Sequence, residues 1–97
     1  MKIKTSELTG SALDWAADLA LGGHNPGTLY SSYWAVGGPI IEREFIWLEG
    51  DYNEWNARIH DNGDRFFVEG PTPLIAAMRC FVASRLGVEV DVPDELV

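Results

Sequence analysis

The sequence predicts an α+β fold in which two main helices pack on a small antiparallel sheet. Residues about 9–21 and about 72–86 carry apolar side chains at helical spacing, each between a capping residue and a glycine. The pair Asn62-Gly63 favours a two-residue hairpin turn, and the segments beside it, about 55–59 and 65–69, alternate between apolar and polar residues. These patterns predict two helices and one hairpin.

The first predicted helix follows Thr9, a residue type that caps helices, and ends at Gly22-Gly23. Its opposite face carries Asp14 and Asp18, one turn apart. Two carboxylates alone make a weak metal site, and no His or Cys lies beside them. They are therefore expected to be solvated. The apolar face consists of Leu13, Ala16, Ala17 and Ala20.

The stretch WAVGGPIIERE raises the question whether its glycines bind a ligand or turn the chain. Gly37-Gly38 tolerates unusual backbone angles, and Pro39 is favoured at the first position of a helix. We therefore expect a long loop over 24–38, a corner at its end and a short helix near 39–44. A short, buried apolar strand should follow at 45–48.

The hairpin register follows from its two-residue turn. It pairs Ile59 with Phe66 and Ala57 with Val68 on the apolar face. That face is expected to cover the core. The opposite face carries Asn56, Arg58, His60, Arg65, Phe67 and Glu69.

The second long helix has the clearest boundaries. Thr72 is placed to cap it, Pro73 suits its first position and Gly87 its end. One face has only small side chains, which suit close packing against the first helix or against a second copy of the chain in a homodimer. The VEVDVP segment after it is expected to form an edge strand or an extended tail. The small face consists of Ala76, Ala77, Cys80, Ala83 and Ser84.

Composition restricts the classes of function. A chain of 97 residues is long enough for one core, so residues 1–97 are expected to form a single domain. The formal net charge is −8 and the few basic residues are scattered, which argues against direct binding of nucleic acid. No run of about 18 apolar residues exists to span a membrane. The N-terminal decapeptide lacks the apolar run of a secretory signal, so a cytoplasmic location is expected.

No set of residues has the spacing of a known catalytic or metal site. His24 and His60 lie far apart in sequence and are expected at the surface. Cys80 is the only cysteine, and its place among alanines favours a buried, unreactive thiol. Catalytic, cofactor-binding and metal-binding residues are therefore not predicted, and enzymatic activity is not favoured.

Aromatic side chains are the remaining candidates for a binding surface. Three of the four tryptophans, Trp15, Trp47 and Trp55, are expected in the core. Trp34 lies on the predicted long loop and is assigned to the surface. The predicted binding surface comprises Tyr30, Tyr33, Trp34, Glu42 and Glu44.

Several stretches taken together resemble the NinX-like family of small phage and prophage proteins. They are LTGSALDWA, WAVGGPIIERE, the Trp55-x-Ala57 motif and GPTPLIAAMRCFVASRLG, with VDVPDEL behind it. They occur in order over nearly the whole chain. The resemblance implies a phage or bacterial cytoplasmic origin and an accessory gene. It implies no activity and assigns no catalytic residue.

Three hypotheses of function remain. The first is a non-enzymatic module that binds a host or phage protein. The second is a small-molecule-binding domain or small enzyme with a pocket under residues 30–44. It predicts a concave apolar pocket with convergent polar groups and at least one titratable residue in a perturbed environment. The third is an acidic mimic of nucleic acid. It requires one continuous face formed by Glu42, Glu44, Asp51, Glu54 and Glu69.

Overall fold

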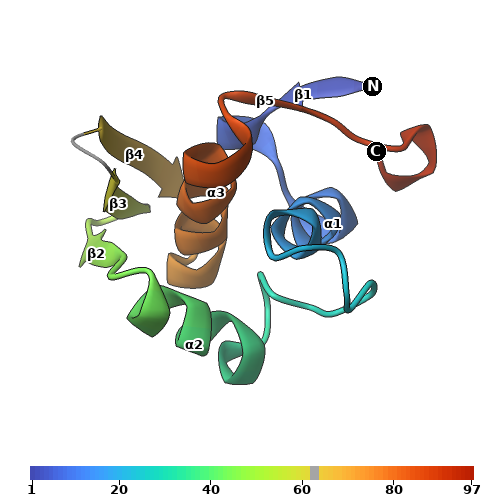
Figure 1. Cartoon of the computed structure of the whole chain (residues 1–97). Helices are drawn as coiled ribbons and strands as arrows, with labels where there is room; N and C mark the ends of the chain where they lie inside the picture. Colours follow the sequence, from blue (N-terminus) through green and yellow to red (C-terminus); the bar gives the residue numbers. More distant parts are fainter. Residues whose placement is uncertain (62–63) are drawn as a thin grey trace.

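The computed structural model describes residues 1–61 and 64–97, with helix α3, Pro73–Leu86, at the centre of the fold (Figure 1). A three-stranded sheet covers one side of α3, and helix α1, Gly10–Ala20, covers another. The Thr72 hydroxyl accepts a hydrogen bond from the Ile75 amide at 3.1 Å, as expected for the predicted cap. The predicted α+β fold is confirmed. Within the described residues, no helix is long and apolar enough to cross a membrane.

The small-residue face of α3 packs inside the chain. Ala76, Ala77, Cys80 and Ala83 are all buried, because α1 and the sheet enclose α3. This face is therefore not available to a second copy of the chain. A homodimer through another surface stays a prediction.

The three-stranded sheet is antiparallel and has the order β2-β3-β4. Ile59 pairs with Phe66 and Ala57 pairs with Val68, so the predicted register is confirmed. The turn predicted at Asn62-Gly63 lies outside the described residues. The strands are β2 (Trp47–Gly50), β3 (Trp55–Asp61) and β4 (Asp64–Gly70).

The acidic face of α1 is buried, so the prediction of a solvated face is wrong. Asp14 is 8% exposed and Asp18 is 6% exposed. The segment after α1 folds back over them. The Ser31 amide donates to Asp14 Oδ1 at 2.8 Å, while the Asn25 amide and the Tyr30 hydroxyl each donate to Asp18 Oδ1 at 3.0 Å. These carboxylates anchor the connection from α1 to α2.

Helix α2 extends over Trp34–Arg43, so the predicted corner at Gly37-Gly38 is wrong. Both glycines lie inside the helix, neither has a positive φ, and Pro39 is its sixth residue. Gly37 is required for a different reason. A Cβ there would lie 2.5 Å from the Tyr30 carbonyl oxygen and 2.7 Å from Leu74 Cδ2. The glycine permits α2 to pack closely on the loop and on α3.

The two ends of the chain form a second, two-stranded antiparallel sheet. β1, Lys2–Lys4, pairs with β5, Glu89–Asp91, which confirms the predicted C-terminal strand. A short 3-10 helix, η1 (Thr5–Glu7), follows β1 and contacts α3 and β4. A second, η2 (Asp94–Leu96), ends the chain. η1 therefore lies near the edge of the three-stranded sheet that β4 forms.

Candidate functional site

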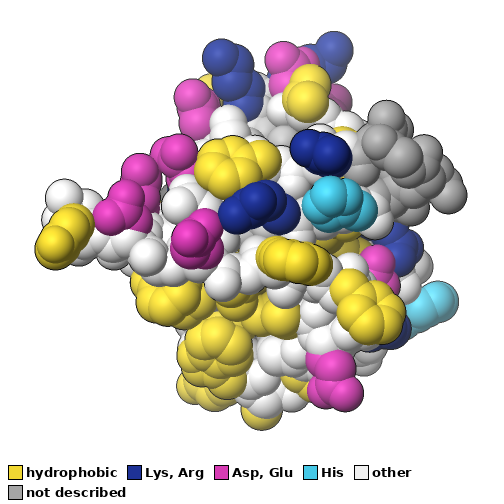
Figure 2. All heavy atoms as spheres, turned by 90° about the vertical axis from the view of Figure 1, so that its left-hand side faces the viewer, with side chains coloured by type: hydrophobic (Ala, Val, Ile, Leu, Met, Phe, Trp, Pro, Cys, Tyr) yellow, Lys and Arg dark blue, Asp and Glu magenta, His cyan; other side chains and the backbone are white. Residues whose placement is uncertain are grey.

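The solvent face of the three-stranded sheet carries a row of large side chains. The strand register places Arg58 of β3 between Trp47 of β2 and Phe67 of β4. Trp47 is 66% exposed and Phe67 is 55% exposed. Figure 2 shows hydrophobic and basic side chains interleaved on this side of the molecule, with a group of acidic side chains at the upper left of the view. We call Trp47, Arg58 and Phe67 the aromatic row.

The exposure of Trp47 corrects the prediction that it belongs to the core. Successive side chains of an extended segment point to opposite sides, and here Ile46 and Leu48 point inward. Trp15 and Trp55 do pack against the core, as predicted. In the apolar stretch at 45–48, two side chains therefore point into the core and two are exposed to solvent.

Phe45 adds a third exposed ring next to the sheet, in a backbone conformation that disfavours it. It is 80% exposed and has a φ of 52°, the left-handed region that suits glycine. The Ile46 amide donates to the Ile41 carbonyl at 3.0 Å and the Phe45 amide to the Glu42 carbonyl at 3.3 Å. This hydrogen-bond pattern ends helices at a residue that is usually glycine. The fold does not require a phenylalanine at this position, so the exposed ring is a candidate for a binding surface.

Replacing Phe45 with glycine is expected to stabilise the fold by about 0.5–1 kcal/mol, because it removes the strain of a left-handed phenylalanine. Chemical denaturation of both proteins measures this change. The control is Tyr52→Gly, since Tyr52 is also exposed but has no positive φ. If Phe45→Gly lowers the free energy of unfolding, the ring contributes to folding and its assignment to a binding surface is wrong.

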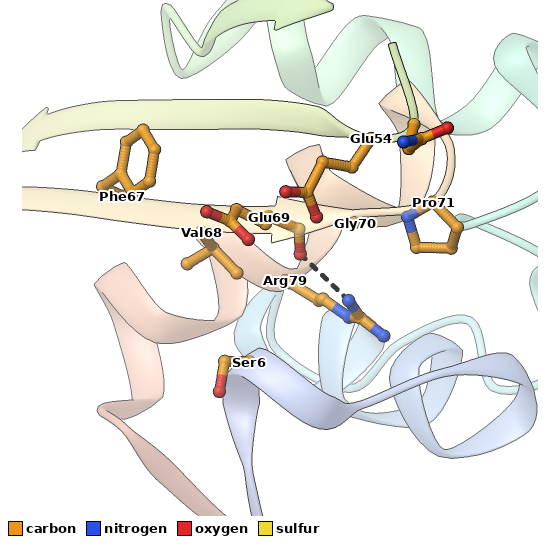
Figure 3. Close-up of a pocket in the computed structure, with 9 residues that line it drawn as sticks. Ser6, Glu54, Phe67, Val68, Glu69, Gly70, Pro71 and Arg79 are labelled. Atoms are coloured by element: carbon orange, nitrogen blue, oxygen red, sulfur yellow. Dashed lines mark hydrogen bonds between the residues drawn. The ribbon is translucent and has the colours of Figure 1, made fainter. Parts of the chain in front are cut away.

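A cavity of about 520 Å³ opens where β4 ends (Figure 3). Glu54 and Glu69 lie close together in its lining, and the charge of Glu69 raises the pKa of Glu54 above its ordinary value. Neither carboxylate forms an ion pair with any described residue. The cavity therefore presents negative charge beside the apolar surface of Phe67 and Pro71.

Arg79 lies in the same cavity but does not neutralise these carboxylates. Its Nε donates to the Leu8 carbonyl at 2.6 Å, and one terminal nitrogen donates to the Glu69 carbonyl at 2.9 Å. Both acceptors are backbone oxygens, one before α1 and one in β4. Arg79 thus connects the N-terminal segment to the sheet, and burial lowers the pKa of its guanidinium.

The comparison with protein families identifies the group to which this molecule belongs. The family model described as "Bacteriophage P22, NinX" matches residues 23–85, more than half of the chain. The chain belongs to this NinX family. The predicted resemblance is confirmed, and the molecule is a phage protein of that family. No curated protein sequence is significantly similar to it. The matched segment contains the aromatic row, Phe45 and both cavity carboxylates.

In this NinX-family protein, only some of the aromatic residues that the sequence assigned to a binding surface are exposed. Tyr30 is buried and its hydroxyl donates to Asp18, so its assignment to a binding surface is wrong. Burial and this hydrogen bond raise the pKa of Tyr30. Tyr33 and Trp34 are exposed, and Trp34 is 55% exposed at the first turn of α2 instead of on a loop.

The acidic residues of α2 have different environments. Glu42 is exposed, whereas Glu44 is half-buried and accepts from Arg85 at 2.6 Å and from Arg43 at 3.0 Å. Burial alone would raise the pKa of Glu44, but the two guanidiniums together lower it. Glu44 is thus paired inside the molecule. Two arginines offset its charge, so Glu44 adds no free negative charge to the acidic face on which the hypothesis of nucleic-acid mimicry depends.

A cavity of about 310 Å³ lies between the start of α2 and the start of α3, next to Trp34. It corresponds to the pocket expected under residues 30–44. Its lining consists of serine, threonine, proline and apolar side chains, with no titratable group among them. The small-enzyme hypothesis required such a group there, so this cavity offers no acid or base for catalysis.

Other residues considered for chemistry occupy structural or surface positions. His24 and His60 are exposed, as predicted. Burial raises the pKa of the Cys80 thiol to about 12, and the thiol donates to the Phe66 carbonyl at 3.3 Å. A thiol with that pKa is a poor nucleophile. In the part of the chain that the structure describes, no three His, Cys, Asp or Glu residues gather to hold a metal ion.

Sequence reasoning placed Phe67 on the solvent face but did not assign it or Trp47 to a site. The missing information was the pairing of β2 with β3, which brings Trp47 and Arg58 side by side. No turn motif between β2 and β3 indicates in the sequence that these two strands pair. One signal was available. If residues 45–48 are treated as a strand with one side exposed, alternate side chains point to opposite sides, which places Trp47 on the surface when Ile46 and Leu48 are buried.

Proposed function

We propose that this NinX-family phage protein is a non-enzymatic module that binds a host or phage protein in the bacterial cytoplasm. The observation that carries the proposal is the aromatic row with Phe45 beside it: three large exposed rings on one side of the molecule. Exposed aromatic clusters with an arginine are typical of protein interfaces, where a few such residues provide most of the binding energy. The net charge of −8 favours a basic partner.

Two tryptophans provide a matched test, since both are more than half exposed and they lie on different surfaces. Trp47 belongs to the aromatic row, and Trp34 belongs to the surface predicted from sequence. Immobilised wild type, Trp47→Ala and Trp34→Ala are incubated with lysate of phage-infected bacteria, and the bound proteins are quantified. We expect Trp47→Ala to lose the partner by about tenfold or more while Trp34→Ala retains it.

Thermal unfolding of the two variants is measured first, because both must be folded for the comparison to hold. Equal capture by Trp47→Ala and wild type would contradict the proposal. If only Trp34→Ala loses the captured partner, the binding surface lies on α2 and not at the aromatic row. Light scattering gives the molar mass of wild type and of each variant. A dimeric wild type beside a monomeric Trp47→Ala would show that a second copy of the chain binds at the aromatic row.

A further inference from the structure

Strand β4 has a free outer edge. It is the last strand in the order β2-β3-β4, and no other described strand pairs with its outer side. β4 is seven residues long, whereas β2 at the opposite edge has four. A free edge presents unpaired N–H and C=O groups to which an extended chain can add. The longer edge is the more suitable one for such an addition.

The outward backbone groups of β4 belong to Arg65, Phe67 and Glu69. In an antiparallel pair only alternate residues exchange hydrogen bonds with the partner strand, and the others direct their groups outward. Arg79 bonds to the Glu69 carbonyl from the side of β4 away from β3 (Figure 3). Glu69 is therefore in the outward set, and the period of two adds Phe67 and Arg65. The outward groups of these two bond to no other part of the described chain.

A groove accompanies this edge along its length. The cavity of about 520 Å³ at the end of β4 and a second one of about 350 Å³ nearer its start share Ser6, Phe67 and Val68 in their linings. The two cavities adjoin at these residues, between β4 and the segment that contains η1, and together we call them the groove. The floor of its second half is apolar and includes Ala83 and Val88.

The two ends of the groove differ in charge. Glu54 and Glu69 lie at one end, where their mutual repulsion raises the pKa of Glu54. Arg65 and Lys4 lie at the other end, together with one acidic residue, Glu89. Phe67, the last residue of the aromatic row, lies between them. An occupant with a cation at one end, a ring in the middle and an anion at the other end is complementary to this arrangement.

We propose that the groove binds an extended segment of the partner protein as an added antiparallel strand, with a basic residue beside Glu69, an aromatic residue beside Phe67 and an acidic residue beside Arg65. This inference rests on the proposed protein-binding function and specifies the partner segment. The aromatic row then continues across the new strand, because residues opposite each other in adjacent strands lie about 5 Å apart.

The order of the partner residues follows from the direction of the strand. Antiparallel pairs are the more stable per residue, so the segment runs opposite to β4 and reads basic, x, aromatic, x, acidic. The x residues point to the other side, toward the apolar floor beside Val68. β-branched side chains such as valine suit those positions.

The test uses the whole wild-type protein and a fluorescent peptide, Lys-Val-Phe-Val-Glu between short Gly-Ser flanks. Saturable binding below about 1 mM is expected by anisotropy. Methylation of the backbone nitrogen of the peptide phenylalanine should weaken binding about tenfold or more, because that N–H faces β4. Methylation of the following valine nitrogen is the matched control and should leave the affinity within about twofold, because that N–H faces away.

Two further measurements address charge and position. The peptide with Lys and Glu exchanged should bind several-fold more weakly, and Glu69→Gln should weaken the original peptide but not one with Gln in place of Lys. Amide exchange of Phe67 and Arg65 should slow when the original peptide binds, whereas that of Val68, which bonds to β3, should stay unchanged.

Absence of saturable binding, or equal effects of the two methylations, would overturn the inference. Equal affinity for the exchanged peptide would refute the assigned direction and charge pairing, on which the inference depends. If the peptide does not bind but Trp47→Ala still abolishes capture of a lysate protein, strand addition is wrong and the proposed function stands. If capture is also independent of Trp47, the proposed function is wrong as well.

Discussion

Replacing Gly37 with alanine is expected to destabilise the protein by about 3 kcal/mol. A Cβ at this position would lie 2.5 Å from the Tyr30 carbonyl oxygen, a backbone atom that cannot move without the loop. It would also lie 2.7 Å from Leu74 Cδ2 in α3. Overpacking of this kind typically costs about 1–3 kcal/mol, and the fixed backbone oxygen places Gly37 at the upper end of that range.

Gly38→Ala is the matched control, since Gly38 is the next residue of the same helix. The nearest atom to its Cβ would be Trp34 Cε3 at 3.8 Å, an ordinary contact. Alanine favours a helix interior over glycine, but Gly38 precedes Pro39, whose ring opposes a Cβ on the preceding helical residue, so the two effects offset and stability should change by no more than about 0.5 kcal/mol. If α2 packs as described, urea denaturation shows a large loss of stability for Gly37→Ala and little change for Gly38→Ala. A destabilised Gly38→Ala beside an unchanged Gly37→Ala would mean that α2 is misplaced.

Elements with local signals could be predicted from the sequence. α3 is bounded by Thr72 and Pro73, whose side chains act within the first turn of the helix. The register of β3 and β4 was predicted from the Asn62-Gly63 pair in the sequence, and the strand pairing agrees with it. In each case the residues that determine the structure are close together in the sequence. The same holds for the burial of Cys80 among alanines.

Elements that depend on distant contacts could not be predicted. Pro39 was assigned to the start of a helix by a local rule, but α2 begins at Trp34 and Pro39 is exposed inside it. Gly37 matters through contacts with the loop and α3, which sequence spacing does not reveal. The candidate surface was missed for the same reason. The exposure of Trp47 depends on which side of β2 faces α3, and that is decided by packing.

Replacing Asp18 with alanine is expected to destabilise the protein by about 3 kcal/mol and to release the connection between α1 and α2. Asp18 is nearly fully buried and accepts hydrogen bonds from the Asn25 amide and the Tyr30 hydroxyl. A hydrogen bond to a charged group is worth about 1.5–3 kcal/mol, and its loss leaves a buried donor unsatisfied. Thermal unfolding measures the loss, and amide exchange of residues 22–33 measures the release.

The two donors of Asp18 can be separated by a second variant. Tyr30→Phe removes one of them and keeps the ring, so it should cost about half as much as Asp18→Ala and leave the Asn25 amide protected. Glu42→Ala, which changes an exposed carboxylate on α2, should alter stability by no more than about 0.5 kcal/mol. If Asp18→Ala were as stable as Glu42→Ala, the buried carboxylate would not hold the loop. The acidic face of α1 would then be solvated after all, and the placement of Tyr30 in the core would be wrong with it.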